Sequence, residues 1–134
     1  MRFFIDNNLP PQFARALDAL SHAEGHSVQH LRDLFPSDTP DHVWLNVLAD
    51  EGNWIIITQD RIRKNDLEKM ALRRTGIVTF MLKKSWSDHK FWEKAQNLVK
   101  WWPRIMEHAE GVTNGVFLVD WRMSGKGKFE TVTV

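Results

Sequence analysis

Short apolar runs alternate along the chain with segments whose apolar residues repeat at helical spacing. The most apolar run is Trp54-Ile55-Ile56-Ile57-Thr58. Because it is apolar on both faces, it predicts a central strand of a parallel sheet that is covered on both sides. Such runs predict strands over residues 3–5, 27–30, 54–58, 77–82, 116–119 and 128–134. Gly125 and Gly127 favour a tight turn, so the last two strands are expected to form an antiparallel hairpin.

Four segments between the strands carry the helical repeat. Pro10-Pro11 marks the entrance of the first helix, because proline fits the first turn, where its missing N–H is not needed. Thr39-Pro40-Asp41 marks the second entrance, with a capping hydroxyl, a proline and an acid near the positive end of the helix dipole. The periodicity predicts helices over about 11–21, about 39–51, about 65–74 and from about 87 past 105.

The pattern also predicts how individual helix residues behave. Leu67, Met70 and Ala71 are expected to face the core from the third helix. Ser87 is expected to cap the fourth helix, and Pro103 to kink that helix or end its first half.

Strands that alternate with helices predict one α/β domain over residues 1–134, a three-layer α/β/α fold with a mainly parallel central sheet and a C-terminal hairpin. The composition, 43% hydrophobic and 26% charged, is typical of a globular protein. The chain has no cysteine, which excludes cysteine catalysis and thiolate metal sites. No apolar run approaches the roughly 20 residues of a membrane span, and no signal segment is visible, so a cytoplasmic protein without membrane contact is expected.

The net charge of +1 conceals a strong asymmetry. Residues 1–60 carry three basic side chains and nine acidic ones, whereas residues 61–134 carry fifteen basic and eight acidic ones. One interpretation is chance combined with solvated helix faces. The other is an acidic centre that needs cations, beside a surface that attracts a polyanion.

Three carboxylates are expected at one edge of the sheet. Asp6 and Asp60 follow the first and third strands, and Asp41 lies in the first turn of the second helix. Taken separately, Asp6 could be a helix cap, Asp41 a helix-dipole acid and Asp60 a turn residue. A cluster of oxygen ligands that binds Mg²⁺ or Mn²⁺ would explain all three together, because converging carboxylates need a compensating cation. Such a metal could activate water against a phosphodiester.

Neighbouring residues would support such a site. Asn8 and Thr58 could orient the metal ligands by hydrogen bonds. The segment after Asp60 is basic, and Arg61 and Lys64 are expected to contact RNA phosphates at the mouth of the cleft, although a solvated helix face would also explain them.

The aromatic residues and histidines give weaker signals. Trp92, Trp101 and Trp102 lie on or beside an apolar helical stripe, so they are interpreted as core residues or homodimer contacts rather than as stacking platforms for RNA bases. The six histidines show no metal-binding spacing, and His26 and His30 are expected to pack or cap.

Several motifs together resemble the PIN-like domains, in particular small stand-alone PIN-like proteins and VapC-type toxins. These are the strand followed by Asp-Asn-Asn-Leu-Pro-Pro (residues 3–11), Gly-His-Ser-Val-Gln-His-Leu-Arg-Asp (25–33), Thr-Pro-Asp (39–41) and Ile-Ile-Ile-Thr-Gln-Asp (55–60). The resemblance covers about residues 1–82, and residues 83–134 are less distinctive. It implies an Mg²⁺- or Mn²⁺-dependent endoribonuclease in which Asp6, Asp41 and Asp60 correspond to the metal-binding acids. For a toxin it also implies an antitoxin protein as partner.

The chain departs from the PIN pattern at one position. PIN nucleases usually carry a fourth acid near the end of the fourth strand, where this chain has Met81-Leu82-Lys83-Lys84, and Asp38 or Asp66 could replace it. Two other classes therefore stay open. One is a non-catalytic PIN-like module that binds RNA or protein. The other is a phosphoryl-accepting receiver domain, which would usually show paired acids where Asp6 is followed by two asparagines.

Overall fold

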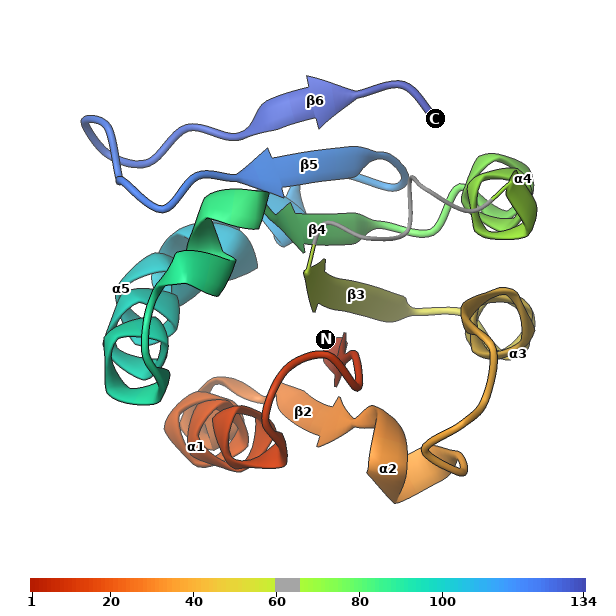
Figure 1. The fold of residues 1–134 in the computed structure, drawn as a ribbon, viewed down its shortest axis with the longest axis horizontal. Helices are drawn as coiled ribbons and strands as arrows, with labels where there is room; N and C mark the ends of the chain where they lie inside the picture. The colour runs from red at the N-terminus through yellow and green to blue at the C-terminus, as the bar shows by residue number, and fades with distance from the viewer. Residues whose placement is uncertain (60–65) are drawn as a thin grey trace.

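The sheet of the computed structural model, which describes residues 1–59 and 66–134, has six strands in the order β2-β1-β3-β4-β5-β6. The strands are β1 (Arg2–Ile5), β2 (Ser27–His30), β3 (Trp54–Gln59), β4 (Thr79–Leu82), β5 (Val116–Val119) and β6 (Glu130–Val132). The first five are parallel, and β6 runs antiparallel to β5. The predicted α/β class, the mainly parallel sheet and the C-terminal hairpin are therefore confirmed (Figure 1).

Helices cover both faces of this sheet, which gives the predicted three layers (Figure 1). The helices are α1 (Pro11–Ser21), α2 (Leu31–Leu34), α3 (Asp41–Glu51), α4 (Asp66–Thr75) and α5 (Phe91–Glu110), with 3-10 turns η1 (His22–Glu24) and η3 (Lys84–Asp88). The short α2 directly follows β2 and is not among the helices that the periodicity predicted. None of the helices in the described part of the chain is long and apolar enough to cross a membrane.

Alternating strand residues build two apolar cores, one on each face of the sheet. In β1, Phe3 contacts Trp102 of α5, with ring centroids 4.7 Å apart, whereas Phe4 contacts Trp44 of α3 at 4.8 Å. All residues of β3 are buried, which is the behaviour predicted for a central parallel strand. This strand therefore has little freedom to slip in register, and the residues at its carboxyl end have fixed positions.

Helix α4 faces the core with only part of the set that the apolar pattern indicated. Leu67 and Met70, predicted to point inward, are 55% and 60% exposed, whereas Ala71 and Leu72 are buried. The inward positions repeat as 68, 71, 72 and 75, the spacing of one helical stripe, and the first and last of them are polar. Because polar side chains occupy half of that stripe, hydrophobic periodicity identified Ala71 correctly but was wrong for Leu67 and Met70.

The entrance of α5 differs from the prediction, and Pro103 does not end the helix. Ser87 lies in η3 and its hydroxyl donates to the carbonyl of Lys84 (2.6 Å), while Lys90 occupies the N-cap of α5. The backbone N–H of Lys90 donates to Glu93 Oε1 (2.8 Å), as in a capping box. The helix continues through Pro103 because buried residues on both sides, including Leu98 and Ile105, attach it to the sheet.

Gly115, just before β5, provides a test of this packing. It has φ +119°, and a Cβ added there would lie 2.9 Å from Cζ of the buried Phe117 ring. We expect Gly115→Ala to lower the free energy of unfolding by about 2–4 kcal/mol, since it combines an unfavourable φ with overpacking. Gly125→Ala is the control, because Gly125 also has a positive φ (+60°) but faces open space, and it should cost about 1 kcal/mol. Equal losses in urea titrations of the two variants would contradict the tight contact at Phe117.

Candidate metal centre

The strand order places a topological switch point between β1 and β3. From β1, the chain continues to β2 on one side and then to β3 on the other. In parallel α/β sheets, ligands bind in the crevice outside the carboxyl ends of the strands at such a point. Asp6 follows β1 directly, and its backbone N–H donates to the carbonyl of Ile57 in β3 (3.0 Å). The first predicted metal ligand therefore stands at this crevice.

Asp6 is buried, with 4% of the residue exposed, and hydrogen bonds from Thr58 and Asn7 hold its carboxylate. The hydroxyl of Thr58 donates to Oδ2 (2.6 Å), and the backbone N–H of Asn7 donates to Oδ1 (2.5 Å). Such short bonds to a charged group fix its orientation. Thr58 thus contacts the Asp6 carboxylate directly.

A small polar pocket of about 250 Å³ brings Asp6 together with two other acids. The residues that line it are Asp6, Asn7, Asn8, Leu31, Ser37, Asp38, Thr39 and Asp41. Asp41 begins α3, and the indole N–H of Trp44 donates to its Oδ1 (2.9 Å), which orients this carboxylate as well. Asp38 is an exposed member of the lining, whereas Asp66 lies in the first turn of α4 and does not line the pocket.

The two asparagines after β1 join the parts of the pocket. Asn8 extends the contact between β1 and β3, because its Oδ1 accepts the backbone N–H of Gln59 (3.3 Å). Asn7 Nδ2 donates to the carbonyl of Ser37 (3.0 Å), and Asn7 Oδ1 accepts Nε of Arg32 (2.8 Å). Sequence reasoning selected Asn8 but missed Asn7 and Arg32. The consecutive asparagines after a strand were the available signal, since short amides commonly bond backbone groups in loops.

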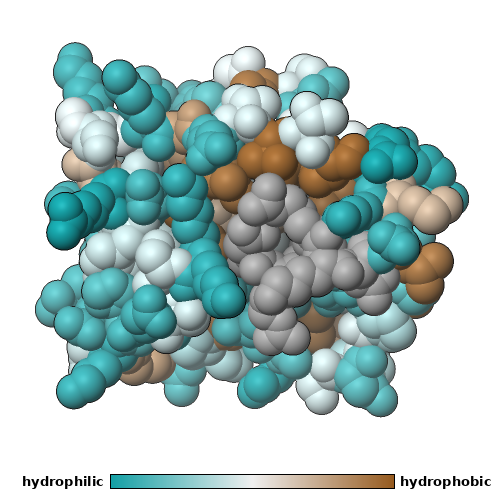
Figure 2. All heavy atoms as spheres, turned by 45° about the horizontal axis from the view of Figure 1, so that its top comes forward, coloured by the Kyte–Doolittle hydropathy of each residue, from teal (hydrophilic) through white to brown (hydrophobic). Residues whose placement is uncertain are grey.

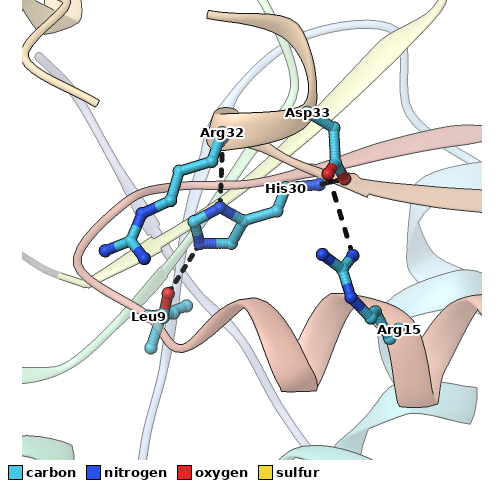
Figure 3. A network of polar contacts seen from close by, with 5 residues as sticks. All are labelled: Leu9, Arg15, His30, Arg32 and Asp33. Carbon is cyan, nitrogen blue, oxygen red and sulfur yellow. Dashed lines mark hydrogen bonds and ion pairs between the residues drawn. The ribbon is translucent and has the colours of Figure 1, made fainter. Parts of the chain in front are cut away.

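A buried histidine attaches α2 to the loop that follows Asp6, as Figure 3 shows. The Nε2 of His30 lies 2.7 Å from the carbonyl of Leu9, and its Nδ1 accepts the backbone N–H of Arg32 (3.1 Å). Only the neutral tautomer protonated at Nε2 satisfies both partners. Asp33 completes the cap by accepting the backbone N–H of His30 (2.9 Å), and Arg15 lies 3.7 Å from the same carboxylate. His30 therefore caps α2.

The electrostatic surroundings keep this histidine neutral. Burial is the main cause that lowers the pKa of His30 below its usual value of 6.5, and the charges of Arg32 and Arg15 lower it further. The bond to Leu9 and the charge of Asp33 oppose this shift without reversing it. Burial and the charge of Arg104 likewise lower the pKa of His108, against the opposing charge of Glu107.

The structure describes only part of the predicted ligand set. It places Asp6 and Asp41 in one pocket, while Asp60, Arg61 and Lys64 lie outside the described residues. Within residues 1–59 and 66–134, no three acids or histidines are grouped as a metal would require. The potential metal ligands that line the pocket are carboxylate and amide oxygens. This set of ligands fits Mg²⁺ or Mn²⁺ rather than a thiolate- or imidazole-binding metal.

Comparison with known families identifies the class of this fold and pocket. The model of a family described as "PIN like domain" matches residues 1–84, which contain β1 to β4 and every residue of the polar pocket. The chain therefore belongs to the PIN-like domain family, a class that often comprises nucleases and commonly uses Mg²⁺ or Mn²⁺. Searches of curated proteins and of solved structures gave no match.

The neutral state of His30 predicts how stability depends on pH. The unfolded chain binds a proton near pH 6.5, whereas folded His30 does so only at lower pH. Its contribution to stability is therefore complete above pH 6.5 and is lost as the pH falls below it. As the pH is lowered from about 7.5 to about 5.5, the free energy of unfolding should therefore decrease. His30 should contribute up to about 1.4 kcal/mol per pH unit to this decrease.

His30→Asn tests this assignment, since asparagine can still accept the Arg32 N–H but does not titrate. Its urea midpoint should be lower at neutral pH, and its stability should vary less with pH than that of the parent. The decisive observation is that the free energy of unfolding depends less steeply on pH in His30→Asn than in the parent. If the two proteins lose stability in parallel as the pH falls, His30 is not the group that titrates.

Proposed function

We propose that this protein is a cytoplasmic, metal-dependent endoribonuclease in which Asp6, Asp41 and Asp60 bind Mg²⁺ or Mn²⁺. The observation that carries this proposal is the polar pocket at the switch point. Asp6 and Asp41, which are distant in the sequence of this PIN-like chain, both line it. Asp60 follows Gln59, the last residue of β3, in the sequence. The oxygen-rich lining supports a hard divalent cation as the partner of these acids.

The chain's own residues would orient the site. A divalent cation bound there supplies an activated water and compensates charge that develops on the phosphodiester. Thr58 and the Asn7 N–H hold the Asp6 carboxylate, and Trp44 holds that of Asp41. Both side chains are therefore already oriented before a cation binds. Asp38 is our candidate for the fourth acid in preference to Asp66, because only Asp38 lines the pocket.

The partners follow from the same proposal. RNA is the substrate, with Arg61 and Lys64 as candidate phosphate contacts. The resemblance to VapC-type toxins supports a toxin that is held by an antitoxin protein. A homodimer is supported by Phe91 and Trp92 on α5, because Trp92 is 73% exposed, whereas Trp101 and Trp102 are buried in the core.

A second candidate function is a PIN-like module that binds RNA or protein without cleaving it. It is favoured by the sequence, which has Met81-Leu82-Lys83-Lys84 where PIN nucleases usually carry a fourth acid. The two functions differ in a single respect that can be measured, which is metal-dependent cleavage.

Single-turnover cleavage of a single-stranded RNA pool with Mn²⁺ tests the proposal. Asp41→Asn keeps the size of the side chain but removes the charge that binds the cation, so cleavage should fall by at least about 100-fold. Asp50→Asn is the matched control, because Asp50 is an exposed acid near the other end of α3, and it should cleave like the parent.

The outcomes separate the two candidate functions. If the parent binds the RNA pool but does not cleave it with Mn²⁺ or Mg²⁺, the enzyme is excluded and the binding module replaces it. If Asp41→Asn cleaves as fast as Asp50→Asn, the acidic pocket is not the site of reaction.

A further inference from the structure

The connection between β5 and β6 carries a group of exposed cations. We call residues 120–129 the basic loop, since Arg122, Lys126 and Lys128 all lie on its surface. Within the described part of the chain, none of these three side chains forms an ion pair. Their charge is therefore available to a ligand. The loop lies beyond residues 1–84, so the family match assigns it no role.

The first half of the basic loop is fixed to the start of α5. Trp121 stacks on His89 with ring centroids 3.5 Å apart and planes 6° from parallel. The side-chain amide of Asn97 donates to the carbonyl of Trp121 (2.8 Å). Arg122, the next residue, is thus attached to an ordered backbone.

The second half is fixed farther along α5. Arg104 Nε donates to the carbonyl of Gly127 (2.8 Å), and the Phe129 ring lies 5.4 Å from the ring of Trp101. Because both halves are anchored, Lys126 and Lys128 also project from a positioned backbone. A ligand would meet cations whose backbone needs little further ordering, which lowers the entropic cost of binding.

The basic loop lies at the same edge of the sheet as the acidic pocket. It leaves the carboxyl end of β5, and because β6 is antiparallel, it returns at that edge, where Glu130 pairs with Leu118. Adjacent strands lie about 4.8 Å apart, so β4 is about 10 Å and β6 about 19 Å from β1 along this edge. The left side of the face in Figure 2, where Figure 1 places the loop, is mainly hydrophilic.

Polar contacts connect the pocket with the loop. Gln59 donates its backbone N–H to Asn8 in the pocket and its side-chain amide to the carbonyl of Lys83 (3.0 Å). The ammonium of Lys83 lies 3.7 Å from Asp120 and 3.2 Å from Glu130. Lys83 therefore pairs with Asp120, the one acid of the basic loop, and with Glu130 just after it, while Arg122, Lys126 and Lys128 form no ion pair with either acid.

We infer that the basic loop binds the RNA backbone and extends the substrate site from the acidic pocket across β4 and β5. This inference rests on the proposed function, and it identifies where the affinity for substrate arises. Phosphates near Asp6, Asp38 and Asp41 are repelled by these carboxylates, so binding energy has to come from cations outside the pocket. Cations that follow one another along the same edge suit a ligand with regularly repeated charges, as RNA has.

The test compares two variants with the same change in net charge. One is the triple variant Arg122→Gln, Lys126→Gln and Lys128→Gln. The control is Lys69→Gln, Lys94→Gln and Lys100→Gln, which removes three charges on α4 and α5 that form no ion pair with any residue the structure describes. Affinity for a fluorescent single-stranded RNA pool is measured in EDTA at about 50 mM and about 200 mM salt, so that binding is separated from cleavage.

The loop variant should bind at least about tenfold more weakly than the parent at the lower salt concentration, and its salt slope should be smaller by up to about 2 units, since each phosphate contact on a single strand contributes about 0.7. The control should change affinity by less than about threefold. If the two variants weaken binding equally, or if the loop variant binds like the parent, the inference is overturned.

Cleavage then distinguishes this inference from the proposed function. With Mn²⁺, the loop variant should be slower only at low RNA concentration and should match the parent at saturation. If the parent binds RNA through the loop without cleaving it, the proposed ribonuclease fails but the basic loop is confirmed. If the parent cleaves and the loop variant keeps full affinity, the ribonuclease stands and the loop has no role in RNA binding.

Discussion

The buried carboxylate of Asp6 is the constraint on which the candidate site depends. A charged group that is 4% exposed is costly unless donors compensate it, and the Thr58 hydroxyl and the Asn7 N–H provide that compensation. Thr58 can do so only because β1 and β3 are adjacent, in a register that aligns Ile5 with Ile57. The parallel pairing of two strands that are distant in sequence thus determines where the charge lies. The rest of the pocket is arranged around it.

The loops that complete the pocket are tied to the same strand end. Asn7 bonds both Arg32 and Ser37, and His30 bonds the Leu9 carbonyl, so α2 and the approach to α3 are fixed relative to Asp6. Asp41 reaches the pocket because α3 starts at the end of this approach. Changes in α2 should therefore affect the position of Asp41 although α2 contributes no acid of its own.

Much of this arrangement could be predicted from the sequence. The apolar runs over residues 3–5 and 54–58 identified β1 and β3, and the alternation with helices predicted that they are parallel. Asp41 was placed correctly in the first turn of a helix, because Pro40 is a strong entrance signal. What could not be predicted depends on loop conformation, which period-based reasoning does not describe. This applies to the pairing of Asn7 with Arg32, the choice of Asp38 over Asp66 as pocket lining, and the common edge of the basic loop and the acids.

The central claim is that a divalent cation binds at the carboxyl edge of β1 and β3. Paramagnetic broadening of backbone amide signals by Mn²⁺ tests this most directly, because the effect falls steeply with distance from the ion. The account predicts that substoichiometric Mn²⁺ removes the signals of Asn7, Asn8 and Thr39, which line the pocket. The signals of Gly52 and Gly76, which precede β3 and β4 at the opposite edge, should persist. Broadening that spares the pocket, or that is equally strong at both edges, would contradict the account.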